Sequence, residues 1–303
     1  MTRRHIIQIL KWVYLAAVVA GAAWYFTNNY AGVVSHLQKI KIENIFFSAI
    51  SLVAGKLILA DMTRLALKKI EENISYQEAL TITSVSQLGK YIPGGIWHFV
   101  GKFGIYKARA VETKDGLRVM IWENAWLLSS AGVVGLLGFL ITGSDTIFAL
   151  VPFSSILFQS SHFLWIIPLL WLVTMALVEL ILFKTIIISD FLVTAIEQVV
   201  AWIFLGLSLF FVFPVGRELL LSIVGAFSLS WVGGYIAVFA PGGIGVRELL
   251  LSLILGTFFS SIELGAFAAA HRFIWIVVEI ILGGISALLF GIPRFKPEPE
   301  NKT

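Results

Sequence analysis

Two short segments combine helix-breaking residues with basic side chains inside strongly apolar sequence. The first is Pro93-Gly94-Gly95, flanked by Lys90 and Lys102, and the second is Pro241-Gly242-Gly243, followed by Arg247. Proline removes a backbone donor and glycine permits positive φ, so each Pro-Gly-Gly is expected to break a helix. Irregular backbone at membrane depth persists only where protein or a water-filled cavity satisfies its polar groups. The sequence therefore predicts two broken, re-entrant elements that face one another around a polar site.

The basic residues near these breaks have the chemistry of an anion site. Arg247, followed by Glu248, stands where a helix is expected to begin after the second break. Helix N-termini attract anions, and arginine binds phosphate oxygens through two parallel hydrogen bonds. We predict that Lys90, Lys102, Arg247 and Arg272 bind a lipid headgroup. An Arg–Glu structural clamp for Arg247 and solvated interfacial positions for the two lysines are the alternatives.

Charged residues also lie within the expected spans. A charge at mid-span costs about 2.5–3.5 kcal/mol on insertion scales, so it is expected to be paired or to face water. We expect Glu123 to pair with Arg272, and Asp61 with Arg64 three residues later on one helix face. With Glu248 and His271, these side chains are candidates for gating or ion coupling. A purely structural role for the ion pairs is the alternative interpretation.

The composition is that of an integral membrane protein. Of the 303 residues, 58% are hydrophobic and only 13% are charged, whereas soluble domains carry about 25% charged residues. The net charge of +4 fits cytoplasmic loops and anionic headgroups better than a nucleic-acid partner. There is no cysteine, there are only 5 histidines, and no metal-binding spacing occurs. We therefore expect neither a metal site nor a cofactor.

The apolar blocks predict an all-α membrane protein with about six transmembrane helices and two re-entrant elements. The re-entrant elements are expected within Gln77–Ala110 and Leu219–Phe259, and the spans are expected at Ile6–Phe26, Ile45–Leu67, Val119–Gly143, Phe163–Phe183, Phe191–Phe213 and Leu264–Phe290. Most of the 22 Lys and Arg residues fall on the cytoplasmic side if the N-terminus is cytoplasmic. We thus predict a multi-pass protein of the cell (inner) membrane with both termini in the cytoplasm.

The two breaks belong to an internal repeat. When Pro93 is aligned with Pro241, the pair Glu123-Asn124 falls opposite His271-Arg272. With a small gap, Ser84, Ser86, Gly89 and Tyr91 match Ser228, Ser230, Gly233 and Tyr235. The expected spans around the two breaks run in opposite directions. One domain, residues 1–303, is therefore predicted to hold an inverted-topology repeat of about 45–143 and 191–290, followed by a cytoplasmic tail, 291–303. This pattern is typical of transporters with a site near the bilayer midplane.

These residues also carry a family resemblance. The segments Lys90–His98 and Ala240–Glu248, with the charged pairs of the third and sixth spans, resemble the flippase-like transmembrane region of lysylphosphatidylglycerol synthases. The resemblance covers about Ile6 to Phe290 and implies movement of lipids between leaflets. It also implies membrane lipids as partners and, as with stand-alone members of that family, an associated glycosyltransferase. The chain has no soluble aminoacyl-transferase domain, so synthesis of lysyl lipids is not expected.

Together these observations predict a non-enzymatic lipid transporter. Its substrate is expected to be an anionic or polyprenyl-phosphate-linked lipid. The alternative is a membrane-embedded enzyme, or an accessory subunit of a glycosyltransferase, that acts on a lipid-linked substrate. An enzyme should turn over its substrate in detergent, whereas a flippase should act only in vesicles.

Overall fold

The computed structural model describes residues 3–92, 96–142, 166–237 and 240–291. All regular structure in these ranges is helical. Within them, six helices are long and apolar enough to cross a membrane. The prediction of an all-α, multi-pass membrane protein is therefore confirmed at this level. Pro93, Gly94 and Gly95, the first predicted break, lie outside the described residues.

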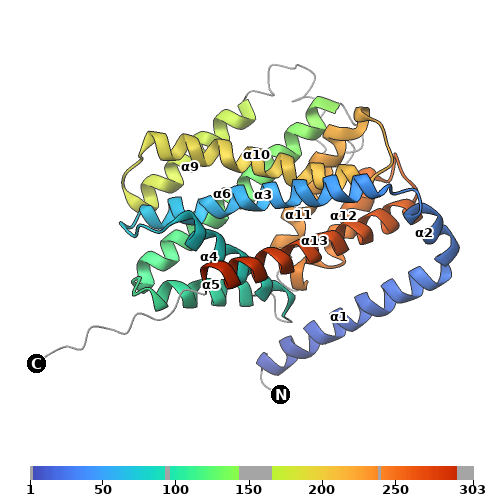
Figure 1. Cartoon of the computed structure of the whole chain (residues 1–303), viewed down its shortest axis with the longest axis horizontal. Coiled ribbons are helices and arrows are strands. Elements are labelled where there is room, and N and C mark those ends of the chain that lie inside the picture. The colour runs from blue at the N-terminus through green and yellow to red at the C-terminus, as the bar shows by residue number, and fades with distance from the viewer. Residues whose placement is uncertain (1–2, 93–95, 143–165, 238–239, 292–303) are drawn as a thin grey trace, which may run out of the picture.

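The helices follow one another along the chain without any intervening strand in the described ranges (Figure 1). Their bounds are α1 Arg3–Asn28, α2 Tyr30–Leu37, α3 Ile42–Lys68, α4 Tyr76–Leu88, η1 Gly89–Tyr91, α5 Trp97–Ala108, α6 Thr113–Thr142, α9 Ile166–Phe183, α10 Ile188–Val212, η3 Arg217–Leu219, α11 Leu220–Ile236, η4 Pro241–Gly243, α12 Val246–Leu255 and α13 Ser261–Phe290.

The predicted spans coincide with long helices, with one addition. Helices α3, α6, α9, α10 and α13 correspond to five of the predicted spans and are among the six helices able to cross. Helix α1 contains the remaining predicted span, Ile6–Phe26, but is not one of those six. In addition, Arg217–Ile236 is long and apolar enough to cross a membrane by itself, although the sequence pattern assigned it to a re-entrant element. The difference arises because Pro-Gly-Gly follows this helix instead of interrupting it, so 20 residues of apolar helix form before the break.

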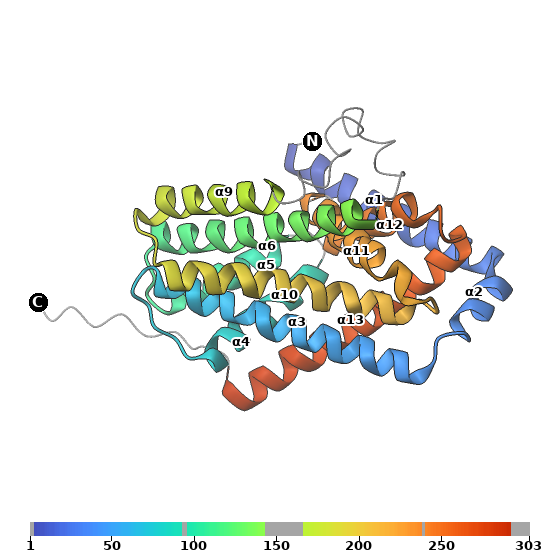
Figure 2. The same cartoon turned by 90° about the horizontal axis from the view of Figure 1, so that it is seen from above.

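An antiparallel pair, α3 and α10, forms the centre of the bundle (Figure 2). Near the start of α3, the Ser48 hydroxyl donates to the Ser208 carbonyl over 2.7 Å. At its other end, Lys68 Nζ lies 2.9 Å from a carboxylate oxygen of Asp190. Helices α4 and α13 pack together on one side of this pair, and α6 and α11 pack together on the other.

The contact between α6 and α11 is a close approach of two backbones. A Cβ added at Gly138 would lie 2.7 Å from the Leu221 carbonyl oxygen and 2.9 Å from the Cα of Gly225. At Gly225, an added Cβ would lie 3.0 Å from the Gly135 carbonyl oxygen. Small residues permit such approaches between membrane helices, where dispersion contacts are a main source of association. These glycines therefore fix α11 against α6.

Two helical hairpins, α4–α5 and α11–α12, extend between the longer helices. In the first, a Cβ on Gly89 would lie 2.8 Å from the backbone of Trp97 and His98, so α5 starts directly against the end of α4. In the second, a Cβ on Gly233 would lie 2.1 Å from a side-chain carbon of Leu250 in α12. Both glycines were matched in the repeat alignment, and both allow the two arms of a hairpin to approach closely.

The ends of the second hairpin lie at the same end of the bundle. The Phe213 ring, at the C-terminal end of α10, has its centroid 4.8 Å from that of Phe259 and 4.9 Å from that of Phe267 near the start of α13. The chain therefore leaves α10 and returns to α13 at one place.

Helices α4 and α13 both begin with a capping box, Ser75 with Glu78 and Ser260 with Glu263, which satisfies free amides of the first turn.

Candidate ligand-binding cavity

A cavity lies between the two hairpins and the helices that surround them. Its volume is about 150 Å³. Elements from both halves of the chain line it, and the short segments η1 and η4 meet at its wall. Its polar and charged lining side chains are Lys56, Thr63, Thr83, Ser84, Ser86, Gln87, Lys90, His98, Lys102, Glu123, Asn124, Tyr235, Arg247 and Glu279.

Arg247 enters the cavity over two glycines. A Cβ at Gly234 would lie 2.4 Å from Arg247 Cγ, and a Cβ at Gly243 would lie 2.7 Å from its Nε. Gly243 has φ +73° and Gly242 has φ +60°, conformations that favour glycine. The Pro241-Gly242-Gly243 break thus does two things at once: it turns the chain and leaves room for the arginine stem. The prediction that Arg247 follows the break at a helix start is confirmed, because α12 begins at Val246.

The guanidinium of Arg247 has no carboxylate partner among the described residues. Its Cζ lies 5.2 Å from the centroid of the Trp231 ring, a cation–π contact. Its Nε is buried without a hydrogen-bond acceptor. Glu248, the adjacent carboxylate, instead accepts from the backbone amide of Gly245 over 2.7 Å. The alternative of an Arg247–Glu248 clamp is therefore wrong.

One carboxylate in α13 holds two lysines. Glu279 Oε1 lies 2.5 Å from Lys56 Nζ of α3 and 2.5 Å from Lys90 Nζ of η1. The Tyr91 hydroxyl also donates to Glu279. The side chains of Lys56 and Lys90 are 14% and 12% exposed, and that of Glu279 is 3% exposed. Lys90 is thus a buried cavity residue, and the alternative of a solvated interfacial lysine is wrong.

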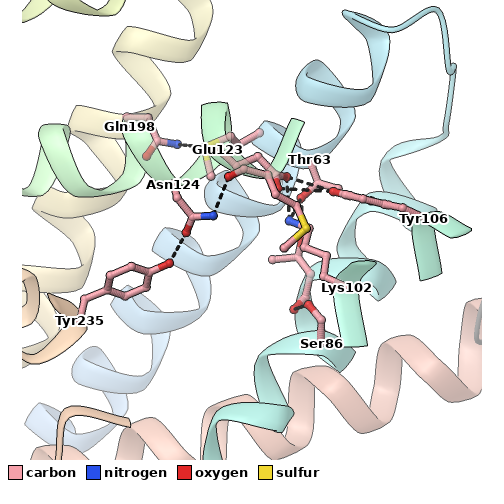
Figure 3. Close-up of polar contacts among 11 residues, drawn as sticks. Thr63, Ser86, Lys102, Tyr106, Glu123, Asn124, Gln198 and Tyr235 are labelled. Atoms are coloured by element: carbon pink, nitrogen blue, oxygen red, sulfur yellow. Dashed lines mark hydrogen bonds and ion pairs between the residues drawn. The ribbon is translucent and has the colours of Figure 1, made fainter. Parts of the chain in front are cut away.

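A second carboxylate, Glu123 of α6, pairs with Lys102 of α5 (Figure 3). Lys102 Nζ lies 2.7 Å from Glu123 Oε1 and donates to Thr63 Oγ1 over 2.9 Å. The Tyr106 hydroxyl is 3.3 Å from the same carboxylate. The side chain of Lys102 is only 14% exposed and lines the cavity, so Lys102 is not a solvated lysine either.

Aromatic rings form part of the wall beside these charges. Tyr235 stacks on Trp231 with centroids 4.8 Å apart, and Trp202 meets Trp231 edge-on at 4.7 Å. The Tyr235 hydroxyl donates to the side-chain carbonyl of Asn124 in α6 (Figure 3). In the same way, Tyr91 of the first hairpin donates to Glu279 of α13. Each hairpin thus has a tyrosine at the matched position that bonds to the last long helix of the other half.

The predicted pair of Glu123 with Arg272 is wrong. Glu123 pairs with Lys102, while an Arg272 guanidinium nitrogen donates to the Gly242 carbonyl over 2.6 Å. Lys102 is within reach of Glu123 because α5 packs beside α6. Arg272 is not, because it lies on the far side of η4 from the main cavity. Arg272 holds the second break in place and does not line the main cavity.

His271 and Glu248 lie behind the same break. They line a second, smaller cavity of about 30 Å³, together with Arg247 and Arg272. His271 Nε2 lies 2.8 Å from the hydroxyl of Ser208 in α10, which accounts for its polar ring inside the bundle. These two gating candidates therefore share the smaller cavity with Arg247 and do not line the main cavity.

Asp61 and Arg64 form the predicted local ion pair. Arg64 donates to both carboxylate oxygens of Asp61 over 2.6 and 2.7 Å. Neither residue lines either cavity. They lie in the C-terminal third of α3. A separate buried pair, Lys69 Nζ and Glu179 Oε1 at 2.5 Å, follows the end of this helix. The structure therefore separates this pair from the headgroup candidates.

Sequence reasoning missed several cavity residues. Lys56, Glu279 and His98 all line the cavity, but none of them was predicted as a site residue. The available signal was the pair of matched tyrosines, Tyr91 and Tyr235, since both hydroxyls bond within the cavity wall. Across the described ranges, no group of three metal-ligating side chains occurs.

Comparisons with protein-family models and with curated proteins found no match.

Proposed function

We propose that the protein moves an anionic lipid between membrane leaflets, with the headgroup passing through the cavity between the two hairpins. The observation that carries this proposal is Arg247, which lines the cavity without a carboxylate partner among the described residues and whose Nε is buried without a hydrogen-bond acceptor. An unpaired buried charge is costly. A phosphate group that accepts two hydrogen bonds from arginine would compensate that cost.

The proposal includes an inverted repeat of two re-entrant hairpins. The order α3–α4–α5–α6 and the order α10–α11–α12–α13 show the same neighbours in contact, and α3 is antiparallel to α10. The shared position of Phe213 and Phe267 supports entry and exit of the second hairpin on one side. In this arrangement α11, although long enough to cross, returns through α12. Both termini are then cytoplasmic.

The topology can be tested by labelling, because the chain has no cysteine. Single cysteines at Asn73 and Lys114 flank the first hairpin, and cysteines at Arg217 and Ser261 flank the second. An impermeant maleimide applied to cells should label Arg217→Cys and Ser261→Cys, while Asn73→Cys and Lys114→Cys should react only in inverted vesicles. Labelling of the two sites of either hairpin from opposite sides would show a full crossing and rule out the re-entrant arrangement.

The activity itself can be tested by comparing vesicles with detergent. The assay uses proteoliposomes that carry a fluorescent anionic phospholipid in both leaflets, with dithionite added outside. Dithionite should bleach nearly all of the label when the protein is present, and only the outer half in protein-free vesicles. In detergent, the purified protein should bind the lipid and leave it chemically unchanged. Chemical turnover of a lipid in detergent would favour the enzyme alternative. If neither lipid binding nor translocation exceeded the level without protein, the proposal of a lipid transporter would be refuted.

A further inference from the structure

The cavity carries more positive than negative charge. Among its described lining residues, Lys56, Lys90, Lys102 and Arg247 are cationic, whereas only Glu123 and Glu279 are anionic. The pair of Lys102 and Glu123, 2.7 Å apart, is neutral as a unit. Two positive charges therefore remain uncompensated by the lining.

Residues of the smaller cavity do not change this balance. Behind the second break they add one cation, Arg272, and one carboxylate, Glu248. The excess of two positive charges is thus the same whether the main cavity is counted alone or with its neighbour. It is a property of the whole polar centre of the bundle.

The two uncompensated charges line the same cavity. One is Arg247, and the other belongs to the Lys56–Glu279–Lys90 group, in which two ammonium groups share a single carboxylate oxygen. A Cβ at Gly242 would lie 3.9 Å from the Lys90 carbonyl oxygen, and a Cβ at the next residue, Gly243, would lie 2.7 Å from Arg247 Nε. The backbone of Lys90 and the side chain of Arg247 therefore approach consecutive glycines of one break.

We propose that the headgroup carried by this cavity bears two negative charges, as a phosphomonoester or a diphosphate does. This inference depends on the proposed function. A dianion compensates both cations, whereas a phosphodiester with one charge leaves a buried cation unpaired and a zwitterionic head adds a further cation. A phosphomonoester has a charge of about −1.5 to −2 at neutral pH because its second pKa is about 6.

The test compares three acyl-labelled lipids in proteoliposomes at pH 8: phosphatidic acid, phosphatidylglycerol and phosphatidylcholine, each with protein-free vesicles as control. Because one additional charge interacts strongly in a buried site, we expect phosphatidic acid to move about tenfold faster than phosphatidylglycerol. At pH 5, where phosphatidic acid is singly charged, this advantage should disappear. Equal rates for the two lipids at pH 8 would overturn the inference and leave the proposed function standing. Absence of movement for all three would instead overturn the proposed function.

A variant gives a second test. Lys56→Met removes one of the two lysines on Glu279 and lowers the excess to one positive charge, so phosphatidic acid and phosphatidylglycerol should then move at similar rates. Lys114→Met, an exposed site outside the cavity, should keep the wild-type preference. An unchanged preference in a folded Lys56→Met protein would contradict the proposal. Uptake of labelled inorganic phosphate, with no lipid movement, would support the charge preference but assign it to a free anion.

Discussion

The Arg247→Ala variant is expected to lose lipid translocation by about 10- to 100-fold while it folds as well as the wild type. Removing a charge-assisted hydrogen bond costs about 1.5–3 kcal/mol, which corresponds to this range. The protein itself loses no ion pair, since Arg247 has no carboxylate partner among the described residues. An unpaired charge whose Nε is buried without an acceptor is a destabilising element, so its removal should leave the melting temperature unchanged or raise it. The measurement is dithionite bleaching in proteoliposomes, combined with thermal unfolding in detergent.

Two controls separate a binding role from a structural one. Arg118→Ala removes an arginine of the same type from a partly exposed pair with Asp115, 2.9 Å apart, and should change neither translocation nor stability measurably. Arg247→Lys keeps the charge but not the two-pronged geometry, so it should retain intermediate activity. Wild-type translocation by Arg247→Ala would remove the central argument for the site.

Arg272→Ala is also expected to abolish translocation, but by releasing the Gly242 carbonyl that Arg272 holds.

The Glu279→Gln variant is expected to be strongly destabilised, and anionic lipid should restore its stability. Loss of this carboxylate leaves Lys56 and Lys90, each 2.5 Å away in the wild type, without an anion. Breaking a buried pair in this way costs about 3–5 kcal/mol, which should lower the melting temperature by about 5–10 °C. Because a ligand stabilises the state that binds it, phosphatidic acid should raise the melting temperature of the variant more than that of the wild type.

Glu179→Gln is the matched control for that prediction. Glu179 also bonds a lysine at 2.5 Å and is fully buried, but it lies outside the cavity lining. It should lose a similar amount of stability without any rescue by lipid. If lipid raised the melting temperatures of both variants equally, the stabilisation would be a general solvent effect and the cavity would not be its site.

The positions of the helices and of the second break could be predicted because they depend on local pattern. Apolar blocks of about 20 residues predict spans, and Pro241-Gly242-Gly243 predicts an interruption that the backbone shows. The same reasoning placed Arg247 at a helix start. It missed that Arg217–Ile236 is itself long enough to cross, since Pro-Gly-Gly comes only after that helix has formed.

The partners of the charged residues could not be predicted in the same way. Glu123 pairs with Lys102, not with Arg272, because α5 returns beside α6 and η4 separates Arg272 from the cavity. Glu279 collects Lys56 and Lys90 from two distant parts of the chain. Such pairings depend on which helices become neighbours. Sequence spacing determines this only within a single helix, as for Asp61 and Arg64.

The glycine contact between α6 and α11 has a consequence for how the protein can open. Helices that touch backbone to backbone at Gly138 and Gly225 cannot slide or tilt without a steric clash. At the corresponding contact between α4 and α13, a Cβ at Gly283 would meet the Leu88 side chain first, at 2.9 Å, and the Ser84 carbonyl oxygen only at 3.4 Å, and side chains can change rotamer. We therefore expect the α4–α5 hairpin to move when the cavity opens, while the α11–α12 hairpin stays in place. The movements that open the cavity to the two leaflets would then differ.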